Sequence, residues 1–338
     1  MSRKIKLIAE TAFHHQGDFD FMKKLVKDIL ETNCMDMIKM HMTVNFDEYM
    51  HKSHPIYDEF KPKCFSEHQW TSLNNIVEEK NKEILLLFND SKSIELGMKF
   101  NPKYVEIHSI CLNDVFLLDC LKYNLSSNVH VVLGVGGCTL NEIESALDYL
   151  RHDKIILMFG FQNFPTKYSD INFKKIKKIM KLFPEMKYGY ADHTAWNEEN
   201  NELITLLGAA LGMDYIEKHV TNCHGEKRID YNSAISLKML KELYKKLNIL
   251  EKCMGNGLLR LNEGEEKYSI YGPMKKAPLL KSDIKRGEKL TLDKIKFQRT
   301  NDLSDLSQID VLNRVGCKVI KNLKSDSILK KSHFKFRK

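Results

Sequence analysis

Two histidines of this 338-residue chain follow short apolar runs: His193 in YGYADHTAW and His219 in YIEKHVT. Two neutral imidazoles on neighbouring strands, with carboxylates nearby, suit a divalent ion such as manganese, iron or zinc and leave positions open for a substrate oxygen. One alternative is a hydrogen-bonded pair of histidines at the polar mouth of the fold. Another is a zinc set that joins His219 to Cys223 and His224. The residues alone leave these three interpretations open.

Lys39 lies within an otherwise apolar run, MDMIKMHM. An ammonium group inside a fold needs an anionic partner. That partner is either the phosphate or carboxylate of a ligand, or a protein carboxylate such as Glu10 or Glu106. A second candidate anion site is the glycine turn LGVGG at residues 133–137, which leads into a helix with a capping box.

The elements that must position these residues alternate between strand-like and helix-like segments. The expected strands are Lys6–Ala12, Met35–Met42, Ile84–Asn89, Tyr104–Ile110, His130–Gly136, Lys154–Phe161, Lys187–Ala191 and Tyr215–Val220. The expected helices include Phe19–Leu30, Gln69–Glu79, Val115–Tyr123, Leu140–Leu150, Phe173–Phe183, Glu199–Leu211 and Leu237–Cys253. This alternation implies right-handed βαβ units and a parallel sheet. Eight such units in about 250 residues fit a closed (β/α)8 TIM barrel better than an open sheet.

A barrel of this kind carries its active site at the carboxyl ends of its strands. The last two expected strands are neighbours there, so we expect His193 and His219 to converge. Further polar residues are expected at the same ends: Glu10, Lys39, His41, Asn89, Asp90, Ser109 and Gln162.

The composition of the sequence changes after Cys253. Residues 256–276 are rich in turn formers and charge and are predicted to be a linker. Residues 277–338 predict a small second domain of short strands and turns, which leaves residues 1–255 for the barrel.

The overall composition, 43% hydrophobic and 29% charged, is typical of a soluble globular protein. The net charge of +8 comes from lysines that alternate with acids along helix faces, so we expect a solvated surface and no nucleic-acid partner. The eight scattered cysteines predict reduced thiols. No apolar run is long enough to span a bilayer, and charged residues interrupt the N-terminal segment, so we expect a cytoplasmic protein with no membrane partner.

With these residues in place, the chain resembles the sialic acid synthase (N-acetylneuraminate synthase) family, whose members condense phosphoenolpyruvate with an N-acylated hexosamine to make nonulosonic acids. The family's opening pattern IAEIGxNHxG is similar to Ile8–Gly17, and its KxQ strand is similar to Lys39–His41. Its SDHT and E-[KR]-H-[FV]-T motifs correspond to Ala191–Thr194 and Glu217–Thr221. The resemblance continues through RIDYNSAIS to the C-terminal SAF (antifreeze-like, β-clip) domain, in APLLKSDIKRGEKLT and KFQRT.

The resemblance implies a divalent metal ion of the manganese or magnesium type, held by His193 and His219, that polarises the aldehyde of the open-chain sugar. The residues that it implies as catalytic are Glu10, Lys39, His193, His219 and Asp230. Those that it implies for phosphoenolpyruvate are Lys39, Ser109, Gln162 and Arg299. Those that it implies for the sugar are Glu10, His41, Phe164 and Asp230. Because the family's SAF-domain arginine reaches the partner subunit's barrel, Arg299 also implies a domain-swapped homodimer.

The chain departs from the family pattern at several of these positions. Glu106 replaces the second phosphate-binding lysine, which changes the local charge by two units. The other departures are His14 for asparagine, His41 for glutamine, Gly134 and Val135 for the serine and threonine of an STG turn, Ala191 for serine, and GFQNFPT at 160–166. They leave two alternatives open: a metal-dependent aldolase or lyase with a different anionic donor, and a non-catalytic sugar-binding regulator.

Overall fold

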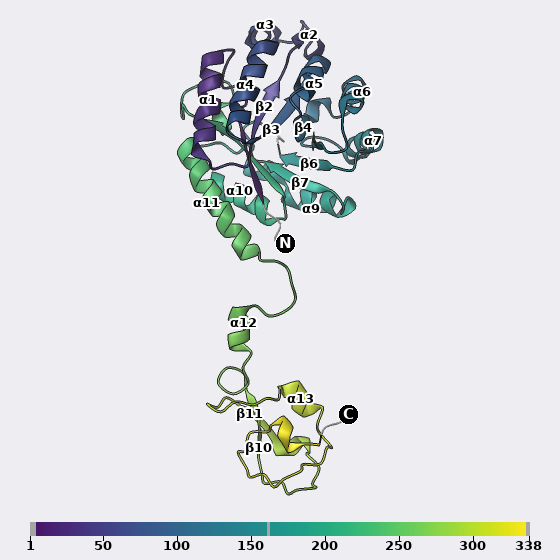
Figure 1. Cartoon of the computed structure of the whole chain (residues 1–338), viewed down its shortest axis with the longest axis vertical. Helices are drawn as coiled ribbons and strands as arrows, with labels where there is room; N and C mark the ends of the chain where they lie inside the picture. Colours follow the sequence, from purple (N-terminus) through teal and green to yellow (C-terminus); the bar gives the residue numbers. More distant parts are fainter. Residues whose placement is uncertain (1–4, 161–162, 336–338) are drawn as a thin grey trace. The chain divides into compact units, whose positions relative to one another are not determined.

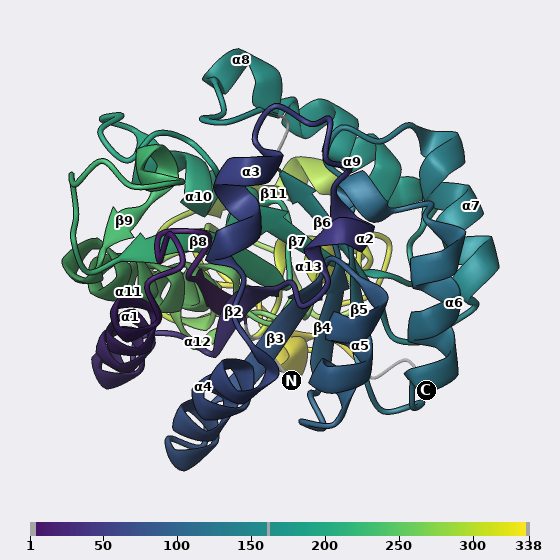
Figure 2. The same cartoon turned by 90° about the horizontal axis from the view of Figure 1, so that it is seen from above.

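The computed structural model describes residues 5–160 and 163–335. The chain divides into two compact units, Met1–Asn256 and Gly257–Lys338. In the first unit the strands lie at the centre and the helices surround them (Figures 1 and 2). Its main strands are β1 (Lys6–Glu10), β2 (Met37–Met42), β3 (Glu83–Phe88), β4 (Tyr104–Ile107), β5 (His130–Gly134), β6 (Ile155–Gly160), β7 (Lys187–Ala191) and β8 (Tyr215–Thr221).

Each of these strands pairs in parallel with the next, and β8 pairs back with β1, so the sheet closes. The closing register places Glu10 opposite His219 and Ala9 opposite Lys218. The predicted (β/α)8 barrel is therefore confirmed.

Helices follow the strands and cover the outside of the barrel (Figure 2). The longer ones are α1 (Phe19–Thr32), α4 (Glu67–Glu79), α5 (Ser91–Met98), α6 (Val115–Asn124), α7 (Leu140–Leu150), α9 (Phe173–Leu182), α10 (Asn201–Ala210) and α11 (Leu237–Met254). The shorter elements are α2 (Phe46–Tyr49), α3 (Tyr57–Phe60), α8 (Tyr168–Ile171) and strand β9 (Ile235–Ser236), which extends the sheet beside β8. Side-chain caps start many helices, among them Asp18 before α1 and Thr139 before α7. Helix α5 is absent from the sequence-based expectation. It contains Gly97, where a Cβ would lie 2.4 Å from the ring of Phe88, so close packing on β3 requires the residue that weakens the helical pattern.

Several strands end earlier than expected. Strand β4 stops at Ile107 because Ser109–Cys111 form a 3-10 turn, and β5 stops at Gly134. The expected strand Lys154–Phe161 corresponds to β6, and its last residue, Phe161, lies outside the described residues.

Side chains alternate between the two faces of the barrel wall. One face packs against the helices in the larger core, which includes Leu7, Ile38 and Ile216. The other fills the barrel interior, with Ile8, Met37 and Tyr215 among its residues. The positions that continue this inner face toward the strand ends are polar, and they form the candidate site described below.

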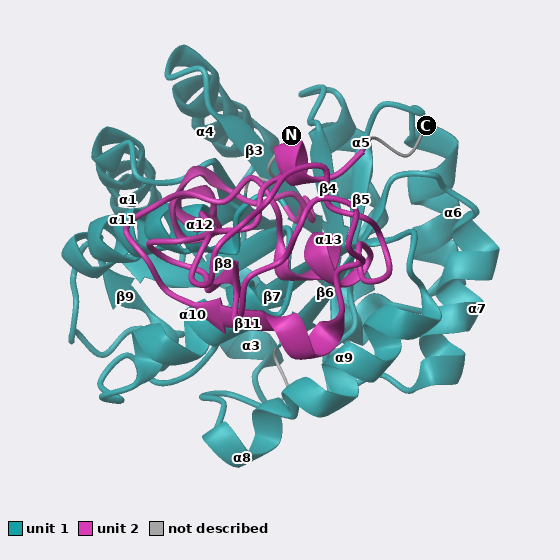
Figure 3. Ribbon diagram, turned by 90° about the horizontal axis from the view of Figure 1, so that it is seen from below, with its two compact units in different colours: residues 1–256 teal, residues 257–338 magenta. Residues whose placement is uncertain are grey.

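The second unit is drawn in magenta in Figure 3. It has a hydrophobic core of its own, which includes Leu280, Leu290, Val311 and Leu329. Its elements are α12 (Glu263–Tyr268), the antiparallel strands β10 (Ala277–Leu280) and β11 (Ile295–Gln298), and α13 (Gln308–Leu312). Helix α12 falls within the segment predicted as a linker, and assignment of residues 277–338 to the SAF class stays a prediction. The eight cysteines are free thiols. Among the described residues, no helix combines the length and apolar character needed to cross a membrane.

Candidate active site

Inward-facing side chains gather at the carboxyl end of the barrel around a cavity of about 200 Å³. In β8 the alternation of side chains turns Glu217 and His219 toward the cavity, while Lys218 faces the helices. The sequence-predicted site residues that line this cavity are Glu10, Lys39, His41, Ser109, Phe164, His193, His219 and Asp230. Gln162 lies outside the described residues. Arg299 belongs to the second unit, where its guanidinium donates hydrogen bonds to the Pro273 carbonyl.

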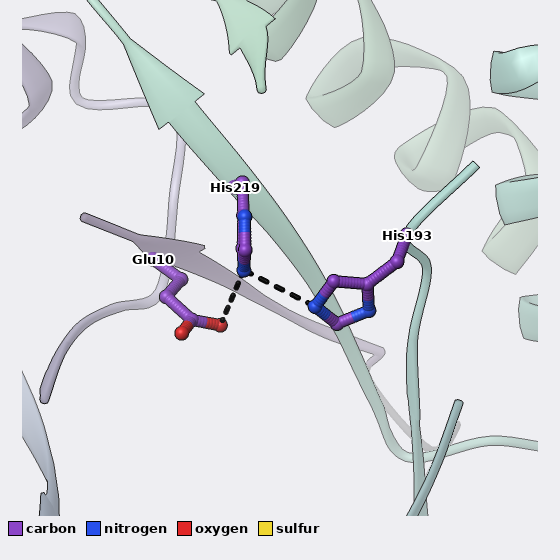
Figure 4. A group of neighbouring side chains, drawn as sticks. All are labelled: Glu10, His193 and His219. Atoms are coloured by element: carbon purple, nitrogen blue, oxygen red, sulfur yellow. Dashed lines mark hydrogen bonds and ion pairs between the residues drawn. The ribbon is translucent and has the colours of Figure 1, made fainter. Parts of the chain in front are cut away.

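The two histidines converge as expected, with His193 Nε2 and His219 Nε2 3.1 Å apart (Figure 4). His193 Nδ1 lies 3.1 Å from the carbonyl oxygen of Ala191. Because a carbonyl only accepts hydrogen bonds, we assign the proton of this ring to Nδ1, which leaves a lone pair on Nε2. Burial lowers the pKa of both histidines, so both rings are neutral. The 3.1 Å separation of the two Nε2 atoms is within the span of two nitrogens that each bind one shared ion at ~2.1 Å.

Glu10 completes this group from the adjacent strand β1. Its Oε2 lies 3.5 Å from His219 Nε2 and is buried with no hydrogen-bond partner among the described residues. Burial alone would raise the pKa of Glu10, but the charge of Lys39 holds it well below its usual range. One ligand atom from each of Glu10, His193 and His219 lies within 4.8 Å of the others (Figure 4). Two imidazoles and one carboxylate suit a divalent transition ion, so the residues present fit a metal.

Sequence reasoning named the two histidines as candidate metal ligands and did not place Glu10 beside them in that set. The signal was available, because closure of a barrel pairs its first strand with its last and so places Glu10 opposite His219. Cys223 instead contacts the hydroxyl of Thr221, and His224 packs its ring against Trp196.

Lys39 binds three buried carboxylates across the barrel interior. Its Nζ lies 2.9 Å from Glu106, 3.0 Å from Glu217 and 3.5 Å from Glu10, and all four side chains are at most 3% exposed. Burial raises the pKa of Glu217 well above its usual range, so Glu217 keeps a proton and shares a hydrogen bond with Glu10. Of the partners considered for Lys39 from the sequence, the structure contains the protein carboxylates Glu10 and Glu106, and it adds Glu217.

The rim of the cavity is formed by loop residues beyond the strand ends. Asp230 accepts a hydrogen bond of 3.0 Å from the backbone N–H of Phe13, which ties the loop after β8 to the loop after β1. The Phe164 ring lies 6.2 Å from that of His193 and 6.1 Å from that of His219, measured between centroids. His41 contacts Glu10 through its Nε2 atom. These groups give one end of the cavity a surface that combines an aromatic ring with hydrogen-bonding side chains.

Two features of the β4 and β5 ends escaped the sequence analysis. His108 lines the cavity because it lies two residues after the inward-facing Glu106. Gly134 cannot take a larger residue with this backbone, since a Cβ there would lie 2.7 Å from the Ser109 nitrogen. Packing therefore excludes the serine side chain that the resemblance places at position 134.

Comparison with known proteins supports the family resemblance that was drawn from the sequence motifs. The NeuB family model matches residues 32–258. An uncharacterized protein of Methanocaldococcus jannaschii is 27% identical over 296 residues, covering 87% of this chain and 84% of that protein. The N,N'-diacetyllegionaminic acid synthase of Campylobacter jejuni is 24% identical over 344 residues, covering 97% of this chain and 99% of that protein.

A solved structure of N-acetylneuraminic acid synthetase from Leptospira borgpetersenii shares the fold, with a TM-score of 0.71, 22% identity, and coverage of 79% of this chain and 90% of that chain. The resemblance drawn from the residues is thus confirmed at the level of the family. Because the family model spans well over half of its length, this chain belongs to the NeuB family.

Proposed function

We propose that this protein is a nonulosonic acid synthase-type transferase, which condenses phosphoenolpyruvate with an N-acylated hexosamine and releases phosphate. The acceptor in this proposal is N-acetylmannosamine or a diacetamido-hexose. The observation that carries it is the convergence of Glu10, His193 and His219 in the barrel of a NeuB family chain. The relative named as a diacetyllegionaminic acid synthase, which matches 97% of this chain, supports the same class of product.

Glu10, His193 and His219 would hold a divalent ion, which we take to be manganese. When bound, such an ion supplies a Lewis acid that polarises the aldehyde of the open-chain sugar. The chain's own contribution is to keep both imidazoles neutral by burial and to place their Nε2 atoms 3.1 Å apart.

The remaining roles in this proposal come from the family resemblance, and the positions of these residues around the cavity support them. Asp230, His41 and Phe164 orient the sugar, with Asp230 as the hydrogen-bond acceptor for its hydroxyls. The enol carbon of phosphoenolpyruvate forms a bond to the aldehyde carbon, water adds to the carbon that carries the phosphate, and phosphate leaves by C–O cleavage. The proton that this water gives up is balanced by the former aldehyde oxygen, which becomes a hydroxyl. Glu10, whose lowered pKa keeps it ionised, orients the water as a hydrogen-bond acceptor.

The donor is assigned to Lys39, Ser109, Gln162 and Arg299. Lys39 and Ser109 line the cavity, which supports their part of the assignment. Arg299 is assigned to the barrel of a second copy in a domain-swapped homodimer, on the family resemblance alone. The cytoplasm is the proposed location.

One observation favours a second candidate, an aldolase or lyase that uses a different anionic donor such as pyruvate. Lys39 already has Glu106 and Glu217 at 2.9 and 3.0 Å. Glu217 keeps its proton, so the charge of Glu106 is what repels an anion next to Lys39, and it repels a phosphate dianion more strongly than a carboxylate monoanion.

The test is phosphate release from phosphoenolpyruvate in the presence of manganese and either sugar. The unmodified protein is compared with His219→Ala and with a control, His51→Ala. His51 is an exposed histidine in the loop between α2 and α3. We expect sugar-dependent release that His219→Ala abolishes and His51→Ala leaves intact. Product formation from the sugar with pyruvate as the donor, and none with phosphoenolpyruvate, would favour the second candidate. Sugar binding without any turnover would favour a non-catalytic regulator.

A further inference from the structure

A second buried ion pair lies on the helix-facing side of the barrel wall. Lys218 immediately precedes His219, and Asp192 immediately precedes His193. Because neighbouring side chains of a strand point to opposite faces, the residues before these inward-facing histidines turn toward helix α10. Lys218 Nζ lies 3.1 Å from Asp192 Oδ2, and both side chains are 0% exposed.

Hydrogen bonds from α10 and from the chain after β7 satisfy this pair. Asn201 Oδ1 accepts from Lys218 at 3.1 Å, and Thr205 Oγ1 donates to Asp192 Oδ2 at 2.5 Å. The other oxygen of Asp192 accepts from the backbone N–H and the hydroxyl of Thr194, at 3.0 and 2.9 Å. Asn201 Nδ2 in turn donates to the carbonyl of Thr194 at 2.9 Å. The network therefore holds the residue on each side of His193.

His193 itself is held between these two residues. The backbone N–H of Asp192 donates to the carbonyl of Glu217 at 3.1 Å, which joins the end of β7 to β8. The carbonyl of His193 accepts from Ser233 Oγ at 2.7 Å and from the backbone N–H of Thr166 at 2.8 Å. The ion pair thus links the two strands at the height of their histidines, one residue away from each.

We propose that Asp192 and Lys218 are positioning residues, which lock β7 to β8 so that His193 Nε2 and His219 Nε2 stand at the separation a shared metal ion needs. Neither side chain lines the cavity within the described part of the chain, so their action is through the histidines.

Stability alone is a weak explanation for this pair. Replacing a buried ion pair by apolar residues of similar volume is often neutral or stabilising, because both ions lose their hydration on burial. What the charged network adds is a fixed geometry, since every oxygen of Asp192 and both ends of Asn201 have directed partners. Removal of residues that orient the metal ligands without binding the metal themselves typically weakens metal affinity by 10- to 100-fold.

This inference rests on the metal site of the proposed function and not on its donor or sugar. The test compares the full-length protein with three variants. The double variant Asp192→Asn/Lys218→Met removes both charges at similar volume and leaves no unpaired charge buried. Lys218→Arg keeps the ion pair, and Leu243→Ala removes a buried apolar side chain of α11 as the matched control for lost stability.

Manganese affinity of the metal-free proteins is measured by titration calorimetry and by the electron paramagnetic resonance of free Mn²⁺, and thermal unfolding is followed in chelator. We expect the double variant to bind manganese about 10- to 100-fold more weakly and Lys218→Arg to stay within about threefold of the unmodified protein. Leu243→Ala should unfold at a lower temperature with unchanged affinity. Unchanged affinity in the double variant, or an equal loss in Leu243→Ala, overturns the inference.

Two further measurements keep the inference testable. If the unmodified protein takes up no manganese, the metal site of the proposed function fails, and crystal structures of the unmodified protein and the double variant decide the positioning role. Nε2 atoms that remain 3.1 Å apart in the double variant would then overturn it, and displaced rings would support it. If the double variant does not fold, Thr205→Val, which removes one hydrogen bond to Asp192, should weaken binding in the same direction by about threefold or more, and an unchanged affinity would overturn the inference.

Discussion

The two sides of the cavity differ in whether the protein supplies its own cation. The histidine side consists of Glu10, His193 and His219, and the lysine side consists of Lys39, Glu106 and His108. On the histidine side, Glu10 Oε2 lies 3.5 Å from His219 Nε2, and two neutral imidazoles turn their Nε2 atoms toward each other. On the lysine side, the ammonium of Lys39 already lies at ion-pair distance from Glu106.

The difference indicates that the two sides have different relations to a ligand. The histidine side presents lone pairs and one negative charge, which a divalent cation would complete. On the lysine side, the charge of Lys39 is matched by Glu106 at 2.9 Å while Glu217 keeps its proton. An added anion on that side must compete with protein carboxylates for the same ammonium group.

The largest effect expected from breaking the lysine side is on folding. Lys39→Met leaves buried carboxylates without their cation, and the loss of one partner from a buried ion pair typically costs about 3–5 kcal/mol. The measurement is the free energy of unfolding in urea at neutral pH. The control is Lys61→Met, which breaks an exposed pair with Asp47 and should lower the free energy of unfolding far less, because water screens that pair. Equal losses in the two variants would mean that the lysine side is not internally paired in solution.

The histidine side should respond in metal affinity. His219→Ala removes one ligand, and we expect manganese to bind at least ~100-fold more weakly, which corresponds to about 2.7 kcal/mol. His108→Asn is the matched variant from the lysine side, and it keeps a cap for the backbone N–H of Ile110. Calorimetry should find its manganese affinity unchanged. A comparable loss in both variants would erase the distinction between the two sides.

Much of the barrel could be predicted from the sequence, because most βα units repeat an apolar run followed by an amphipathic helix. The meeting of His193 and His219 was also predictable, since consecutive strands of a barrel are neighbours. The residues at which the strands end were harder to predict from the sequence. Where β4 stops depends on the 3-10 turn at Ser109–Cys111, which a run of apolar residues does not reveal.

Contacts across the barrel interior were the hardest to predict. Lys39, Glu106 and Glu217 come from β2, β4 and β8. Only the radius of the closed barrel and the side-chain lengths bring Lys39 Nζ within 3.0 Å of both carboxyl groups. The alternation of side chains shows which of them face inward, but not which of them touch. The role of Gly134 was hidden for a similar reason, because its neighbour Ser109 belongs to another strand's loop.

The lysine side can be sharpened by removing one charge. Glu106→Gln keeps the shape of the side chain and leaves Lys39 with more of its charge to offer. We expect phosphoenolpyruvate to bind about tenfold more tightly, which corresponds to ~1.4 kcal/mol. The measurement is calorimetric titration of the metal-loaded protein in the absence of sugar, with Glu106→Asp as the variant that retains the charge. If Glu106→Gln binds phosphoenolpyruvate no more tightly than Glu106→Asp and the unmodified protein do, the donor's anionic groups lie away from Lys39. That result would favour the second candidate function.

The smallest expected effect concerns protonation on the lysine side. Burial, followed by the charges of His41 and Lys39, lowers the pKa of His108 to about 3, whereas an unfolded histidine titrates near 6.5. The unfolded chain therefore binds a proton there more readily than the folded chain, so His108 contributes stability above pH 6.5 that is lost as the pH falls toward 3. Between pH 7.5 and 5.5 the loss from this one group should be ~1 kcal/mol. Urea unfolding of the unmodified protein and His108→Asn at both pH values isolates it, because all other groups are shared. If the difference between the two proteins stays constant across this range, His108 does not remain neutral beside Lys39, and the lysine side is more open to solvent and anions than its pairing indicates.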